Sequence, residues 1–494
     1  MGKRILILLA VIAVVVAALP PLFGIMYERQ IRAQVEEAPD YPYLSYALDS
    51  YDRGLYSSQG SFRLAFSDEY VEQMRAVLTP PQDEPPTDEQ QAIVDNLLEF
   101  VGGEVRFDIT VDHGPITFSN GINAALAQVH AELDSTTGAL AEFQAWVNAP
   151  YLYQVDAVVD FDGSSDFTAS VPAMSVTEGD ARLDFSGFDT TGRYDNRVRN
   201  VKATGKSDSL RVESQGVSIT MNQLEFETDS RILEGYMWLG TSGFDVGNFA
   251  VAGPQGKSPD AISIRDFGVD VSSEMNAAGD KVSISMDQRL AEVTGVPDID
   301  VRDFLFSLRL HDIDLDATKR YIALNQKLAL ASVESIEAMV REMESLAEQV
   351  LRGSPSIDIE QLRMTLNGEP LMAKAHIEID GDALPPGVDL LPGYANPELL
   401  LAAMSADGRI EASETIAKMM ATDIVRDQII AGLPPEAQVT DAEIDELASQ
   451  QSAAVIDALI EQGALQRAAG KLSVDFKFAD SQLTVNGAPM PFGP

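Results

Sequence analysis

Two Gly-Lys-Ser triplets are the first residues of this sequence that could carry chemistry, since such a triplet closes many phosphate-binding loops. They occupy Gly205–Ser207 and Gly256–Ser258. A phosphate-binding loop also needs a glycine five residues earlier, so that the backbone can curl around the phosphates. Asn200 and Val251 stand at those positions. Both triplets therefore predict exposed turns between strands and no nucleotide site.

Acidic residues are spaced like calcium ligands in two places. Asp312, Asp314 and Asp316 match the start of an EF-hand loop, but alanines stand where that loop requires a glycine and a bidentate glutamate. A second cluster has a more suitable composition: Asp160, Asp162, Gly163 and Asp166. An Asp-Gly hairpin turn explains the same four residues and is the favoured interpretation. A weak cation site is the alternative.

Nucleophilic and metal-dependent catalysis find little support in the sequence. The chain has no cysteine and four histidines, and it contains neither an HExxH motif nor a Gly-x-Ser-x-Gly turn. An acidic-site hydrolase would need two carboxylates that converge in a pocket, which a sequence cannot display. We therefore predict a protein without enzymatic activity, with no catalytic, cofactor-binding or metal-binding residue and no cofactor.

Strands dominate the elements that would position any site, from about residue 104 to residue 316. Apolar residues alternate with polar ones in four segments: 105–111, 217–221, 282–286 and 306–310. Because one face of each strand is polar, this pattern predicts antiparallel sheets with one face in water. The phase of the alternation slips at Asn222 and Gln223, which predicts a turn or a bulge.

Helices and strands are predicted to mix after Asp316. Apolar spacings of three, four or seven indicate helices around 321–350, 397–404, 416–430 and 444–460. Thr440 and Glu443 have the spacing of a capping box ahead of the last helix. Strand patterns interrupt and close this part at 362–366, 377–379 and 472–478.

The fold class predicted from these patterns is α+β and β-rich, with extended antiparallel sheets, a mixed C-terminal part and one N-terminal transmembrane helix. Four regions follow: a signal anchor over 1–27, a juxtamembrane helix with the first strand and helices over 28–103, an antiparallel β region over 104–316, and a mixed α/β region over 317–494.

The transmembrane prediction rests on an uncharged apolar run from Ile5 to Phe23 that follows Lys3 and Arg4. At about 1.5 Å per residue this run matches the ~30 Å hydrocarbon core of a bilayer. The leading basic residues predict a cytoplasmic N-terminus and a body on the other side. A cleavable signal peptide shares these features, but the length of the run and the prolines at 20 and 21 favour an uncleaved anchor.

The charge balance restricts the partners. The chain has 77 acidic and 35 basic residues and a net charge of -42 at pH 7. A phosphate backbone would be repelled by most of its surface, so nucleic acid is not an expected partner. Either a saline habitat or an acidic envelope protein from an ordinary habitat explains this composition.

Three segments carry a resemblance to a known family: Ser50–Ser58 (SYDRGLYSS), Asp112–Pro115 (DHGP) and Leu483–Gly487 (LTVNG). Through them the chain resembles the YdgA/YihF-like family of bacterial envelope proteins of unknown function. The resemblance implies a single pass through the bacterial inner membrane, a periplasmic body and a homodimer, and it implies no catalytic residue. The candidate family-motif residues are Tyr51, Arg53, Gly54, Ser57, Ser58, His113, Gly114, Pro115, Asn486 and Gly487.

These positions also have a structural interpretation. Arg53 and Gly54 would form a turn ahead of a strand. Gly114 and Pro115 would end one strand and restart another, because glycine permits positive φ and proline holds φ near about -65°. A functional role for His113 is the sharper alternative.

The apolar face of the predicted sheet suggests two functions. Apolar burial contributes about 25 cal/mol per Å2, so a wet face of this size is very unfavourable and must be covered. The first hypothesis is an envelope protein that binds lipid or another apolar ligand in a β groove. The second is a non-catalytic dimeric scaffold that recruits envelope partners through the helices around 321–350 and 444–460.

Overall fold

The computed structural model describes residues 19–37, 44–78, 98, 102–118, 121–136, 138–214, 216–233, 237–253, 262–297, 299–328, 333–386, 397–432 and 439–490. The chain forms two compact units. Unit 1 comprises residues 1–242 and 319–340, and unit 2 comprises residues 243–318 and 341–494.

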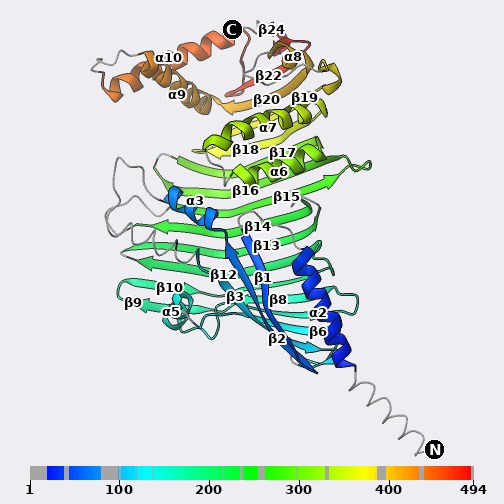
Figure 1. Ribbon diagram of the computed structural model, residues 1–494. Helices are drawn as coiled ribbons and strands as arrows, with labels where there is room; N and C mark the ends of the chain where they lie inside the picture. Colours follow the sequence, from blue (N-terminus) through cyan, green and yellow to red (C-terminus); the bar gives the residue numbers. More distant parts are fainter. Residues whose placement is uncertain are drawn as a thin grey trace, which may run out of the picture. The chain divides into compact units, whose positions relative to one another are not determined.

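Unit 1 is built on an antiparallel sheet (Figure 1). Its neighbouring strands are, in order, β1 (Leu44–Arg53), β2 (Ser57–Phe66), β3 (Val105–His113), β6 (Ala127–Leu133), β7 (Gln154–Val159), β8 (Ser165–Val171), β11 (Phe188–Tyr194), β12 (Asn200–Ser214) and β13 (Val217–Ile232). A hairpin of β9 (Met174–Glu178) and β10 (Ala181–Phe185) pairs with β12. β4 (Ile116–Thr117) and β5 (Asn123–Ala124) form a separate two-stranded sheet. The helices α3 (Asp68–Leu78) and α5 (Gly138–Val147) lie in connections.

The helix α2 (Pro20–Glu37) packs on the first strands of this sheet. Its Tyr27 is buried in a core with Ile109 and Val111 of β3. Gly24 lies against His113, and a Cβ atom at position 24 would overlap the imidazole ring. The missing side chain therefore sets how closely α2 approaches the sheet.

Unit 2 is also an antiparallel sheet. Its neighbouring strands are β15 (Ile262–Met275), β16 (Lys281–Val296), β17 (Ile299–Asp314), β18 (Ser356–Leu366), β19 (Glu369–Ile379), β20 (Met404–Ser413), β22 (Lys471–Ala479), β23 (Gln482–Val485) and β24 (Ala488–Met490). β21 (Gln466–Ala468) pairs with β22. β14 (Trp238–Ala252) crosses the division between the two units.

Helices accompany the strands in the C-terminal part: α6 (Leu315–Leu328), α7 (Val333–Arg352), the 3-10 turn η2 (Gly381–Ala383), α8 (Pro397–Ala403), α9 (Glu414–Gly432) and α10 (Asp441–Glu461). The predicted capping box is confirmed at the start of α10. The Thr440 side chain accepts from the Glu443 backbone N–H, and the Glu443 carboxylate accepts from the Thr440 backbone N–H at 3.0 Å.

The turn or bulge predicted at Asn222 and Gln223 is not found, because β13 runs through both residues without a shift in its register. Gln223 has a φ of 54°, in the left-handed region that few side chains other than glycine adopt. β12 and β13 stay paired on both sides of it, through Ser207↔Leu224 and Ser209↔Asn222. A single left-handed residue therefore lies inside a continuous strand whose pairing with β12 is the same on both sides.

The prediction of an N-terminal transmembrane helix was wrong for the described part of the chain. Residues 1–18 lie outside the described residues, and α2 begins at Pro20 and carries charges such as Glu28, Arg29 and Arg32. Among the helices that the structure describes, none combines the length and the apolar character needed to cross a membrane. The fold is β-rich, with large antiparallel sheets and accompanying helices.

Candidate functional site

The candidate residues of the first two motifs meet at one end of the unit 1 sheet. Tyr51 and Arg53 lie at the end of β1, Ser58 at the start of β2, and His113 at the end of β3. The register pairs Tyr51 with Gly60 and Ser58 with Val111. Tyr51, Ser58 and His113 therefore lie on the same face of the sheet, the face that α2 covers.

Ser58 and His113 form a buried hydrogen-bonded pair. The Ser58 Oγ lies 2.7 Å from the His113 Nε2, and the two residues are 1% and 3% exposed. Burial lowers the pKa of His113, while the Leu55 carbonyl and the Asp112 carboxylate oppose this effect. The imidazole is therefore neutral near pH 7, because a charged ring would lose its hydration.

A serine hydrogen-bonded to a neutral histidine is part of the arrangement used in nucleophilic catalysis. That chemistry also needs a group that orients the second ring nitrogen. The Nδ1 of His113 has no hydrogen-bond partner among the described residues, and Gly24 of α2 packs on the ring. In this geometry the pair is buried and connects β2, β3 and α2.

Three further buried polar atoms lack a hydrogen-bond partner in the described structure: the Tyr51 hydroxyl, Thr117 Oγ1 and Ser165 Oγ. Burial raises the pKa of Tyr51, and the nearby Ser58 hydroxyl offsets part of this rise although its geometry falls short of a hydrogen bond. Each unsatisfied buried group costs on the order of 1–3 kcal/mol. This end of the core is therefore less stable than an apolar core of the same size.

The remaining residues of these motifs shape the turns. Arg53 forms an ion pair with Glu28 of α2 at 2.6 Å, and the Gly54 N–H donates to the Ser57 carbonyl at 2.9 Å. A side chain at Gly114 would overlap the Ala125 carbonyl, and Pro115 follows through a cis peptide bond. The first two motifs thus act together as packing and turn residues.

The third motif lies in unit 2. Asn486 and Gly487 form the turn between β23 and β24, both with positive φ. The Asn486 side chain donates to the Gly463 carbonyl at 2.9 Å and accepts from the Asp475 N–H at 2.9 Å. These contacts join the turn to the end of α10 and to β22, which is a structural role.

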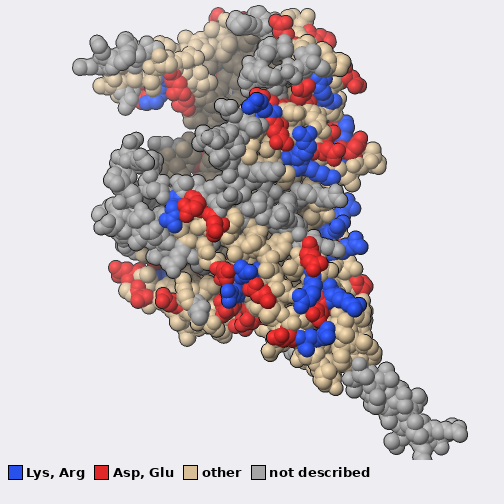
Figure 2. Space-filling view, in the orientation of Figure 1, with Lys and Arg blue, Asp and Glu red and all other residues tan. Residues whose placement is uncertain are grey.

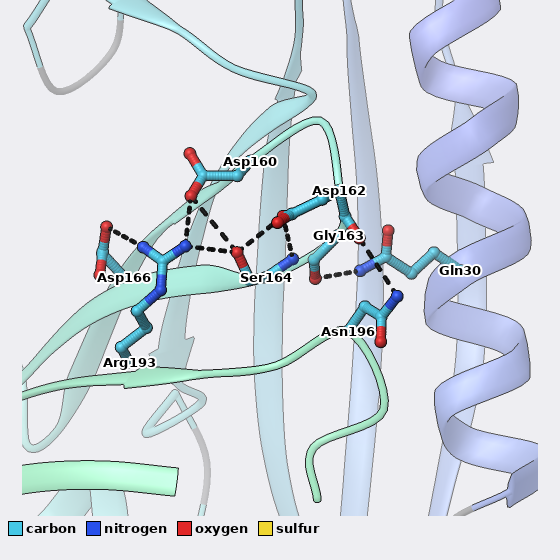
Figure 3. A network of polar contacts seen from close by, with 8 residues as sticks. All are labelled: Gln30, Asp160, Asp162, Gly163, Ser164, Asp166, Arg193 and Asn196. Atoms are coloured by element: carbon cyan, nitrogen blue, oxygen red, sulfur yellow. Dashed lines mark hydrogen bonds and ion pairs between the residues drawn. The ribbon is translucent and has the colours of Figure 1, made fainter. Parts of the chain in front are cut away.

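The acidic cluster around Asp162 is a hairpin turn between β7 and β8. Figure 3 shows Arg193 between Asp160 and Asp166, with N to O distances of 2.7 Å and 2.8 Å. Asp162 accepts from the Ser164 hydroxyl at 2.7 Å, which lowers the pKa of Asp162. Within the described residues there is no group of three or more side chains that could hold a metal ion. The carboxylates already have partners, which supports the hairpin interpretation.

The same turn holds α2 in place. Gln30 of α2 donates to the Gly163 carbonyl at 2.9 Å, and Asn196 donates to the Asp162 carbonyl at 3.2 Å (Figure 3). Gln34 of α2 donates to the Asn196 carbonyl at 3.1 Å. The sequence indicated the turn but not its contact with α2, because the partners are more than a hundred residues apart.

Unit 2 presents a broad apolar face that the described residues cover only in part. The strand register aligns mainly apolar residues, apart from Gln288 and Gly408, in three neighbouring rows: Ile284, Leu310, Ile357, Ile377, Ala406 and Phe478; Val271, Met286, Leu308, Ile359, Ala375, Gly408 and Phe476; and Val269, Gln288, Phe306, Leu362, Ala373, Ile410 and Val474. Of these residues Phe478 alone is buried, and Val271, Ile357 and Ile410 are 39–43% exposed. We name this surface the apolar face of unit 2.

The opposite face of the same sheet is polar. Asp358 contacts two histidines, His376 at 2.6 Å and His311 at 3.3 Å, and its contact raises the pKa of His376. An open groove of about 560 Å3 follows this face and includes Arg409 and Asp475, which form an ion pair at 2.8 Å. Figure 2 shows acidic and basic side chains interspersed over the visible surface. The sequence placed these residues on the polar phase of their strands, but it did not bring them together.

Comparison with known proteins identifies a family and no characterised relative. Residues 1–492 match the model of a family described as "Bacterial protein of unknown function (DUF945)". No curated protein and no solved structure matches the chain.

Proposed function

The chain belongs to the DUF945 family of bacterial proteins of unknown function, and from that premise we propose that it binds lipid or another apolar ligand along the apolar face of unit 2. The observation that carries the proposal is the partial exposure of the three apolar rows on β15 to β22.

The dimensions and chemistry of this face suit an extended acyl chain. Six or seven strands at about 4.8 Å spacing make each row roughly 30 Å long. The rows contain aliphatic and aromatic side chains, with Gln288 as the polar exception. Apolar surface gains about 25 cal/mol per Å2 when it leaves water. A long apolar ligand therefore gains affinity from many side chains without a specific polar contact.

The experiment compares the two faces of the same sheet. We would purify the full chain without detergent, extract it and identify bound lipid by mass spectrometry, and then titrate a fluorescent fatty acid. Ile357→Asp and Ile410→Asp place a charge on the apolar face, at positions 39% and 43% exposed. We expect each to weaken fatty-acid binding at least about tenfold, because the charge must be desolvated against the acyl chain.

Met372 offers a matched control. It is 40% exposed and pairs with Glu411, on the opposite face of the sheet. Met372→Asp should bind the fatty acid like the unmodified chain, with circular dichroism showing that all variants are folded. A chain that carries no lipid and binds no apolar probe, or equal losses in all three variants, would contradict the proposal.

A scaffold function is the second candidate, and a different observation favours it. The antiparallel helices α9 and α10 are joined by an Arg426–Asp445 ion pair at 2.8 Å, yet they expose large apolar side chains: Met419, Met420, Ile424, Ile430, Leu447 and Val455. Several large apolar side chains that stay exposed on one helix pair favour a protein interface. We propose a second copy of the chain as the partner.

The scaffold candidate is tested by oligomeric state. Light scattering of the full chain should give the mass of a dimer, and Ile424→Asp should lower it to that of a monomer. Gln450→Asp, a charge added at an exposed position of α10, should leave the dimer intact. A monomer in the unmodified chain would eliminate this candidate.

Several expectations from the sequence stay predictions. They are the closer relationship to YdgA/YihF-like proteins, the location at the bacterial inner membrane with a periplasmic body, and the lack of enzymatic activity. Cell fractionation and protease protection of the full chain would test the location.

A further inference from the structure

We propose that the end of unit 1 where α2 begins is a membrane-docking surface, which inserts the tips of its loops into a lipid bilayer. We define this surface, the apolar rim, by six side chains: Leu22, Leu55, Tyr56, Phe118, Ile122 and Phe161. The inference is independent of the ligand proposed for unit 2.

The sheet order brings these residues to one end of unit 1. Leu55 and Tyr56 lie between β1 and β2, Phe118 and Ile122 between β3 and β6, and Phe161 between β7 and β8. Because these strands pair in the order β1, β2, β3, β6, β7 and β8, alternate connections lie at the same end. Five of the six rim residues therefore lie on three loop tips at this end, and Leu22 lies in the first turn of α2.

Contacts among the loops and with α2 show that they lie close together. The His113 N–H, at the end of β3, donates to the Tyr56 carbonyl at 2.8 Å, and the Leu126 N–H, at the start of β6, donates to the Val159 carbonyl at 2.8 Å. The rings of Phe23 in α2 and Phe161 are 5.7 Å apart. The first turns of α2 thus lie beside the three tips.

The degree of exposure sets the rim apart from ordinary surface residues. Its six side chains are between 52% and 79% exposed. A single exposed leucine needs no explanation, but several large apolar tips at one end of a domain mark an interaction site. Tyrosine, phenylalanine and leucine are the side chains that settle at the boundary between headgroups and acyl chains.

The sequence leading into the rim identifies lipid as the occupant. Residues 5–18, which precede α2, consist only of isoleucine, leucine, alanine and valine, and α2 begins at this end of the unit. Two of the basic side chains nearby form ion pairs, Arg53 with Glu28 and Arg193 with Asp160. With a net charge of -42, attraction to anionic lipid cannot drive docking, so apolar insertion must.

A depth-sensitive probe tests the rim separately from the rest of the chain. The chain has no cysteine, so Phe118→Cys accepts a single environment-sensitive fluorophore, and Asp180→Cys places the same probe on an exposed turn between β9 and β10. We would reconstitute the full chain with phosphatidylcholine vesicles. At position 118 we expect a blue shift and loss of quenching by aqueous iodide, whereas the probe at position 180 should stay quenchable.

Binding strength provides the second measurement. Phe118→Ser and Ile122→Ser should each reduce vesicle partitioning roughly tenfold, since each removes one large apolar side chain from the bilayer. Val217→Ser, at an exposed apolar position at the far end of β12 and β13, should leave it unchanged. High salt should not release the protein, because the attraction is apolar.

Three results would overturn the proposal. The first is a probe at position 118 that iodide still quenches although the chain is bound to vesicles. The second is a blue shift of the emission at position 118 that occurs without vesicles and grows with protein concentration, which would indicate a second copy of the chain on the rim. The third is a blue shift of the same emission that occurs without vesicles at every protein concentration, which would indicate that the chain covers its own rim.

Discussion

At the scale of single residues, His113 is a titratable group that the fold removes from water. Burial holds the pKa of His113 below the usual 6.5, so His113 binds a proton more weakly in the folded chain than in the unfolded chain. The resulting stability is complete above the usual pKa and is lost as the pH falls through the folded value. Between about pH 7 and about pH 5 the free energy of unfolding should therefore fall more steeply in the unmodified chain than in His113→Gln.

His376 serves as a control, because its pKa shift and therefore its effect on the pH dependence of stability have the opposite sign. Its contact with Asp358 raises its pKa above 6.5, so its stabilisation is present at low pH and is lost as the pH rises through the folded value. His376→Gln should lose stability mainly on the acidic side relative to the unmodified chain. Urea titrations at several pH values measure these differences, and parallel pH profiles for the chain and for His113→Gln would contradict the first prediction.

At the scale of elements, the docking of α2 depends on a residue that has no side chain. Gly24 faces the His113 ring, and α2 is further held by the buried Tyr27 and by the Gln30 contact to Gly163. Replacing glycine by alanine inside a helix usually stabilises it by about 0.5–1 kcal/mol. Here Gly24→Ala should instead destabilise unit 1 by roughly 1–3 kcal/mol, because the new methyl group forces α2 or the imidazole to move.

Two variants separate this clash from helix propensity. Arg29→Ala, at an exposed position of α2, should change the unfolding free energy by less than about 0.5 kcal/mol. Adding His113→Ala to Gly24→Ala should recover part of the unfolding free energy that Gly24→Ala loses. The two residues are in contact, so their effects on stability are coupled. A Gly24→Ala variant as stable as the unmodified chain would show that α2 docks without this close approach.

At the scale of the whole molecule, the excess of acidic residues is the dominant electrostatic feature. Ion pairs such as Arg409 with Asp475 and Arg309 with Asp287 engage basic side chains across strands, yet the net charge remains -42. Salt screens both the pairs and the repulsion, and exposed pairs are individually weak. We expect the thermal midpoint to rise when sodium chloride increases from about 0.02 M to about 0.5 M.

An uncharged solute serves as the comparison. Sucrose at matched osmolality strengthens burial without screening charge, so the midpoint should rise further in sodium chloride. A midpoint that falls with salt would mean that the ion pairs outweigh the repulsion. The same measurement bears on the two explanations of the acidic composition, because a chain adapted to a saline medium should require salt for full stability.

Local patterns in the sequence determined much of the secondary structure. Two-residue alternation indicated the strands, the Thr440 to Glu443 spacing identified the start of α10, and the Asp162-Gly163 pair indicated the turn between β7 and β8. The change of phase at Asn222 and Gln223 predicted a turn or a bulge, whereas β13 continues there with a single left-handed residue. These features depend on neighbours within a few residues, which is the distance over which backbone sterics and capping act. Hydropathy alone was a weaker guide at the N-terminus, because no helix among the described residues is suited to cross a membrane.

Tertiary structure decided what those elements do together. The alternation of apolar and polar residues shows which residues of a strand share a face. It does not show which other strand pairs with that strand, or what covers the face. Strand order placed His113 against Ser58, brought Arg193 to Asp160, joined two histidines at Asp358 and gathered three apolar loop tips at one end of unit 1. These contacts link residues far apart in the chain, and their formation depends on register and packing that no local pattern encodes.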